Sequence, residues 1–188
     1  MQTGRRIVGL SFTSVSLMFA RILRLGAMSQ DFSDGFAVTV AQEDGRWRVR
    51  TFRDSFEDFQ RSVAAVRGLR SEGASFALLN VEDDYLVVVR PGPSRTRVLL
   101  SDVTMAVDDD FAADVLQEAG VEVPDIDPDE LDDVDGWADG DFAIFEDLGL
   151  SEERVSIMFD QDADPEDLVH TIADELGFAD ALEDALDE

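Results

Sequence analysis

The sequence predicts an α+β fold: a five-stranded, mostly antiparallel sheet in the order β-β-α-β-β-β-α, followed by an acidic linker and C-terminal helices. Three observations predict this class. A hairpin signal lies between two alternating segments near residue 45, and two short, almost wholly apolar runs follow at 75–81 and 85–89. Apolar residues elsewhere recur every three or four positions, which is the spacing of one helix face. Strands and helices in this order suit an antiparallel sheet with helices packed on it.

The first two strands are expected in "FAVTVAQEDGRWRVR". Large apolar residues alternate with Ala and Thr in 36–40 and with Arg in 46–50, as in half-buried strands. Asp44-Gly45 separates the two segments. Both central residues of a type I′ turn need a positive φ, which Asp-Gly adopts readily, so an antiparallel hairpin is expected.

A helix is predicted to follow, beginning at Asp54 and ending before Gly73. Asp54 and Glu57 have the spacing of a capping box. The apolar residues of one helical face are Phe56, Phe59, Val63, Val66 and Leu69.

The two apolar runs, "SFALLNV" and "YLVVV", predict central strands buried on both faces, joined by the turn at 82–84. A fifth strand is expected in "RTRVLLSD" after the break "PGPS". A helix at about 103–119 should then end at Gly120.

Residues 121–140 have the composition of an acidic linker, which would divide a sheet domain at 29–120 from a helical region at 141–188. Helices are predicted in "DFAIFEDLG", "SEERVSIMF" and "DPEDLVHTIADELGFADALEDAL". In the last of these, Asp164 and Pro165 mark the start and Gly177 a break.

Residues 1–28 stand apart from the rest of the chain. Arg5 and Arg6 precede an apolar run too short to span a bilayer as a helix. Three interpretations remain open: a signal or anchor, an amphipathic tail, or an extension from a mis-called start codon with Met28 as the true first residue. The change of composition at Met28 favours the third, and no membrane association is expected.

Charge is distributed very unevenly. The whole chain has a net charge of −28. Residues 101–188 account for it, because they hold 32 acidic residues and a single Arg or Lys, Arg154. Such a surface repels phosphate, so direct binding of nucleic acid by this half is disfavoured.

No pattern of residues predicts a metal site, a cofactor or a reactive centre. Cysteine is absent and His170 is the single histidine, which leaves no usual zinc ligand set. The acids at 125, 127 and 129 resemble the start of an EF-hand, but Glu130 occupies its glycine position; the acids at 160, 162 and 164 fail in the same way. No nucleophile elbow, P-loop or dinucleotide-binding motif occurs, so the chain is not expected to be an enzyme.

Two sets of charged residues are candidate interaction sites. Period-2 geometry places Arg46, Arg48 and Arg50 on one face of the second strand, opposite Trp47. This face is either exposed to solvent or binds acidic groups, which would be carboxylates of the chain's own C-terminal half or a phosphate of nucleic acid. The candidate acidic docking segment consists of Asp125, Asp127, Asp129, Asp132, Asp133 and Asp135.

The chain resembles the tRNA adenosine deaminase-associated proteins of high-GC Gram-positive bacteria. The resemblance rests on "FAVTVAQEDGRWRVR", "ALLNVEDDYLVVVRPGPSRTRVLLSD" and "IADELGFADALEDAL", and covers about residues 35–187. The family is named after genes that neighbour a tRNA adenosine deaminase gene, and it supplies no functional residues to transfer. The zinc deaminase signature is missing here, so the resemblance does not imply deaminase activity.

Three hypotheses for function follow. The first is a cytoplasmic, non-catalytic accessory protein that binds a tRNA-modifying deaminase, or another basic partner, through its acidic half. The second is a small-ligand or hydrolytic domain with a site between the sheet and the helical tail. The third is a structural protein whose acidic half only maintains solubility.

Overall fold

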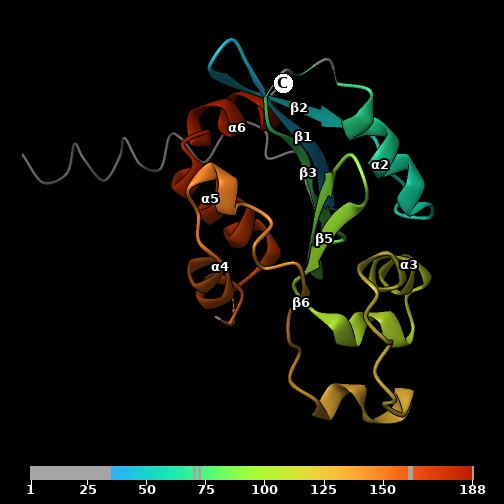
Figure 1. Cartoon of the computed structure of the whole chain (residues 1–188). Coiled ribbons are helices and arrows are strands. Elements are labelled where there is room, and N and C mark those ends of the chain that lie inside the picture. The colour runs from blue at the N-terminus through green and yellow to red at the C-terminus, as the bar shows by residue number, and fades with distance from the viewer. Residues whose placement is uncertain (1–34, 70, 72, 161–162, 188) are drawn as a thin grey trace, which may run out of the picture. The chain divides into compact units, whose positions relative to one another are not determined.

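The computed structural model describes residues 35–69, 71, 73–160 and 163–187. Its centre is an antiparallel sheet with the strand order β2-β1-β3-β4-β5-β6 (Figure 1). The strands are β1 (Gly35–Glu43), β2 (Arg46–Phe52), β3 (Ser75–Val81), β4 (Tyr85–Pro91), β5 (Thr96–Leu100) and β6 (Asp139–Gly140). The predicted antiparallel α+β sheet is confirmed, with a sixth strand that the sequence did not reveal. The interpretations of residues 1–28 concern a segment outside the described residues.

The predicted hairpin joins β1 to β2. Asp44 and Gly45 have φ values of 51° and 73°, so both central turn residues are in the left-handed region that a type I′ turn requires. The register pairs Glu43 with Arg46 on either side of this turn. β2 has β1 as its one neighbour in the sheet and therefore forms an edge strand.

β3 and β4 are central strands, as predicted. Residues 76–81 and 85–89 are buried without interruption. These β-branched and aliphatic runs have no polar face because helices cover the sheet on both sides.

The first sheet face is covered by α2 (Phe59–Arg67), the 3₁₀ helix η2 (Val103–Val107) and α3 (Asp110–Ala119). α2 begins later than the sequence predicted. Asp54 does not cap it; its carboxylate accepts hydrogen bonds from the Phe56 amide at 3.1 Å and the Ser62 hydroxyl at 2.6 Å, and Asp58 is the N-cap. Phe56 takes a φ of 52° and reaches the core from this turn.

The predicted helix at 103–119 is divided into η2 and α3. Asp109 separates them because its side chain caps α3, accepting a hydrogen bond from the Phe111 amide at 2.7 Å. The same carboxylate accepts a hydrogen bond from the Tyr85 hydroxyl at 2.7 Å. Burial and this hydrogen bond raise the pKa of Tyr85, so the phenol stays protonated and links β4 to α3.

On the opposite side lie α4 (Glu152–Phe159), α5 (Pro165–Leu176) and α6 (Ala179–Leu186); α5 and α6 contact the strands and α4 packs on α5, so the sheet lies between two helical layers (Figure 1). Phe76 projects from β3 into this interface and makes ring contacts with Trp47, Phe145 and Phe178 at centroid distances of 5.0–6.1 Å. Gly177 has a φ of 78° and separates α5 from α6 at the predicted break.

Two other elements differ from the predictions. The proposed linker at 121–140 contains the 3₁₀ helix η3 (Pro128–Asp133) and β6, which pairs with Leu99 and Leu100 of β5. The segment 141–149, predicted as a helix, consists of turns and the short 3₁₀ helix η4 (Glu146–Leu148). Ile144 and Phe145 are fully buried there, so their apolarity reflects packing against the sheet and not helical periodicity.

Among the residues that the structure describes, no helix combines the length and apolarity needed to cross a bilayer.

Candidate functional site

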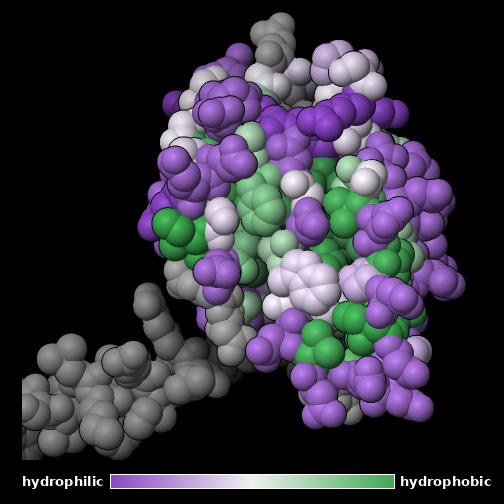
Figure 2. All heavy atoms as spheres, turned by 60° about the horizontal axis from the view of Figure 1, so that its bottom comes forward, coloured by the Kyte–Doolittle hydropathy of each residue, from purple (hydrophilic) through white to green (hydrophobic). Residues whose placement is uncertain are grey.

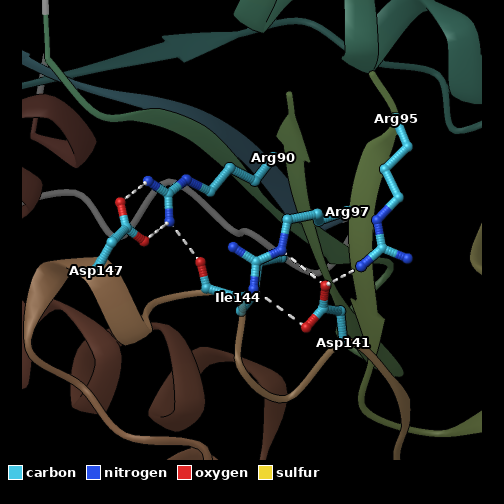
Figure 3. A network of polar contacts seen from close by, with 6 residues as sticks. All are labelled: Arg90, Arg95, Arg97, Asp141, Ile144 and Asp147. Carbon is cyan, nitrogen blue, oxygen red and sulfur yellow. Dashed lines mark hydrogen bonds and ion pairs between the residues drawn. The ribbon is translucent and has the colours of Figure 1, made fainter. Parts of the chain in front are cut away.

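Arginines on β4 and β5 bind the segment that follows β6 (Figure 3). Arg90 and Arg97 are cross-strand partners on the face covered by the C-terminal helices. The Arg90 guanidinium donates two parallel hydrogen bonds to Asp147, each 2.6 Å long, and a third to the Ile144 carbonyl. This bidentate geometry is the strongest that an arginine and a carboxylate can form.

A second pair lies beside it. Arg97 donates to both oxygens of Asp141, at 2.7 and 3.1 Å, and Arg95 adds a bond of 3.2 Å to the same carboxylate. The hydrogen bond from Arg97 lowers the pKa of Asp141, and that from Arg90 lowers the pKa of Asp147. These arginines therefore attach residues 141–147 to the sheet.

The row formed by Arg46, Arg48 and Arg50 is in a different place. All three side chains are exposed on edge strand β2, on the face that Phe52 shares and opposite Trp47. Arg48 lies 3.2 Å from Glu43, which is its diagonal neighbour on the adjacent strand β1. β1, β3 and β4 separate this row from Arg97, so the two sets do not form one basic surface.

The candidate acidic docking segment runs along the surface through η3. Asp125, Asp127, Asp129, Asp133 and Asp135 are exposed, and Asp132 lies within η3. The Asp127 carboxylate caps η3 by accepting a hydrogen bond from the Asp129 amide at 3.1 Å. In the described part of the chain, no group of three or more His, Cys, Asp or Glu side chains is arranged to hold a metal ion.

Exposed apolar side chains accompany these acids, which sequence reasoning did not anticipate. Val123, Val134 and Trp137 expose 43%, 37% and 44% of their surface. Figure 2 turns the lower side of Figure 1 forward and shows apolar side chains gathered there between hydrophilic ones. An apolar patch with a polar rim is typical of a surface that binds another protein.

A cavity of about 700 Å³ adjoins this patch at one end of the sheet. Its walls are formed by the β3–β4 turn, residues 101–102 after β5, residues 135–138, the end of α4 with Asp160, and residues 163–168 at the start of α5. Its acidic lining consists of Asp83, Asp84, Asp102, Asp135, Asp160 and Asp164; its large apolar lining consists of Trp137, Phe142, Phe159, Pro165 and Leu168. These residues come from distant parts of the sequence, so no local pattern could have revealed the cavity.

Comparison with known proteins identifies the class of this acidic sheet protein. Residues 35–179 match the family model described as "Rv3753c-like tRNA adenosine deaminase-associated protein". The chain is also 42% identical over 159 residues to Protein Rv3753c of Mycobacterium tuberculosis (strain ATCC 25618 / H37Rv), covering 84% of this chain and 90% of that protein. The chain belongs to the Rv3753c-like tRNA adenosine deaminase-associated protein family. No solved structure matches it.

Proposed function

We propose that this protein is a non-catalytic accessory protein that binds a tRNA adenosine deaminase, or another basic protein that handles RNA, in the cytoplasm. The observation that carries the proposal is the surface around η3, where exposed carboxylates border the exposed side chains of Val123, Val134 and Trp137. Charge alone would serve solubility, whereas apolar side chains held at the surface favour a protein partner. The family description points to a deaminase as that partner.

Electrostatics give this binding a mechanism. Residues 101–188 carry 32 acidic residues against one arginine, so a basic partner is attracted over distances of about a Debye length, roughly 10 Å at 0.1 M salt. A tRNA-binding groove is basic because it neutralises phosphates. The acidic surface would occupy such a groove in the absence of tRNA, and tRNA would compete with it for the same groove.

Co-purification tests the proposal. The tagged full-length protein and the deaminase of the same organism are mixed at about 50 mM and about 500 mM salt, with and without tRNA. A complex is expected at low salt, with weakening at high salt and displacement by tRNA. Absence of a complex even at low salt would refute the proposal.

Point variants are better suited to this experiment than truncation. Removing residues 121–188 would also remove α4–α6 and expose buried residues such as Phe76, Leu78 and Leu86. The truncated chain would then lose its partner through misfolding. Substitutions of exposed acids leave this packing unchanged.

The cavity at the end of the sheet favours a second candidate, a domain that binds a small cationic ligand. It lies between the sheet and the C-terminal helices, where the small-ligand hypothesis requires a site, and its lining is acidic and aromatic. The exposed apolar residues outside the cavity favour the protein partner. Binding of agmatine, measured by calorimetry, distinguishes the two candidates.

A further inference from the structure

We infer that the cavity beside Trp137 is the docking point for a partner segment that carries an arginine or lysine side chain flanked by apolar side chains. This inference rests on the proposed function and specifies where and how the partner is recognised. We call the cavity lining together with the adjacent Val134 the docking cleft.

Trp137 is held at the wall of the cavity by its backbone. Its carbonyl oxygen accepts a hydrogen bond of 2.9 Å from the amide of Val103, at the start of η2. The preceding Gly136 lies against Asp102; a Cβ atom at Gly136 would be 2.2 Å from the Asp102 carboxylate. Asp102 cannot easily move, because it accepts hydrogen bonds from the Thr104 amide and hydroxyl at 2.9 and 2.6 Å. The backbone at Trp137 is therefore held in place, while 44% of the residue is exposed.

The charge of the cavity is largely uncompensated. Of its acidic residues, Asp102 accepts hydrogen bonds from Thr104, and Asp83 accepts one from the side-chain amide of Asn80 at 3.0 Å. Asp84, Asp135 and Asp160 are exposed. None of the described residues that line the cavity is basic. The cavity therefore attracts a cation and repels phosphate.

An aromatic ring beside several carboxylates matches the chemistry of an arginine side chain. A guanidinium can stack on an indole while its N–H groups donate to carboxylates, and a lysine ammonium can lie over the same ring. Val134, which precedes the lining residue Asp135 in the chain, adds an exposed apolar side chain next to the cavity lining, which suits a peptide chain better than an isolated cation. A tryptophan at a cleft with adjacent apolar contacts has the character of an interface hot spot.

Fluorescence offers a direct test because the chain has two tryptophans. Trp47 donates a hydrogen bond to the Leu176 carbonyl and contacts Phe178, away from the cavity lining. In a full-length Trp47→Phe variant, Trp137 becomes the sole tryptophan reporter. A five-residue peptide alternating arginine and leucine should change its emission saturably. The same peptide with glutamate for arginine should not.

Charge variants then locate the site. The triple substitution Asp84→Asn, Asp135→Asn and Asp160→Asn should weaken peptide binding about tenfold or more, measured by the anisotropy of labelled peptide. A control with the same charge change outside the cavity, Asp174→Asn, Glu183→Gln and Asp184→Asn, should change it less than about threefold. Trp137→Ala should weaken it about fivefold or more, the size of a cation–π contact.

Several results would overturn the inference. Equal weakening of peptide binding by both triple variants would mean that the peptide is attracted to an acidic protein in general. Unchanged emission of Trp137 on addition of the peptide would show that the peptide binds away from the docking cleft. Agmatine binding as tightly as the peptide would indicate a small-cation site.

Failure of this inference is distinguishable from failure of the proposed function. If the deaminase co-purifies and Trp137→Ala leaves that complex unchanged, the docking cleft is not the binding site, but the proposed function is retained. If the peptide binds as expected but no deaminase complex forms, the inference about the docking cleft is retained and the partner is a different basic protein.

Discussion

The two faces of the sheet differ in how their helices are attached. α2 and α3 cover one face mainly through apolar side chains, and Asp58 and Asp109 cap their N-termini. α4–α6 cover the other face through an aromatic group around Phe76, and the segment before them is bound by Arg90 and Arg97. The second face also leaves an acidic cavity at one end.

This difference shows that the acidic half has two roles in the structure. Asp141 and Asp147 are used internally, because each pairs with arginines of the sheet. The acids at 125, 127, 129, 133 and 135 are exposed, and no basic residue is among the described residues that line the cavity. Formal charge alone therefore does not distinguish the acids that attach the C-terminal segment from those that we propose bind a partner; the positions of the sheet arginines distinguish them.

The largest expected effect tests whether the two faces unfold together. Phe76→Ala and Phe111→Ala each remove a buried ring, from opposite faces, and each should reduce the free energy of unfolding by about 3–5 kcal/mol. Urea unfolding followed by circular dichroism should show one transition in both variants, whereas the exposed Val134→Ala control should change stability by less than about 0.5 kcal/mol. Two separate transitions would show that the faces are independent.

A smaller effect is expected at the ion pairs of the C-terminal face. Asp141→Asn should reduce the free energy of unfolding by about 1–2 kcal/mol at neutral pH, because the interaction of Asp141 with Arg97 is bidentate and half-buried. The pKa of Asp141 in the folded protein lies below its ordinary value near 3.8. The ionised carboxylate therefore stabilises the fold fully above about pH 3.8, and this stabilisation is lost as the pH falls through the folded pKa. Urea midpoints across this range should converge for the wild type and Asp141→Asn. Asp114→Asn, an exposed acid on α3, serves as control; a gap that persists in acid would contradict the ionic interpretation.

The smallest effect is expected on edge strand β2. Replacing Arg46, Arg48 and Arg50 together with Gln should change the free energy of unfolding by less than about 1 kcal/mol, since these side chains are exposed and Glu43 supplies the salt bridge. Arg97→Gln, with the same loss of charge per residue, should reduce the free energy of unfolding by more than the triple variant does. If the triple variant is the less stable of the two, the β2 row has a structural partner, and the contrast between the arginine sets is wrong.

Local signals predicted most of the elements correctly. Asp44-Gly45 fixed the first hairpin because its turn depends on the φ values of two residues. The uninterrupted apolar runs at 76–81 and 85–89 identified strands covered on both faces. The helix start at Asp54 and the helix at 141–149 were predicted wrongly, since a carboxylate that accepts backbone hydrogen bonds and a buried apolar run also occur in turns.

The sequence by itself determined the α+β class, the order of the main elements and the family, because hydrophobic periodicity, turn chemistry and composition are written locally along the chain. The candidate site was only partly visible: the acids at 125–135 could be named, but not the cleft beside Trp137. Tertiary structure alone decided which face the C-terminal helices cover, that two residues complete the sheet as β6, and which arginines meet carboxylates. These outcomes depend on contacts between residues far apart in the sequence, 57 positions for Arg90 and Asp147 and 129 for Trp47 and Leu176, and no local pattern specifies such contacts.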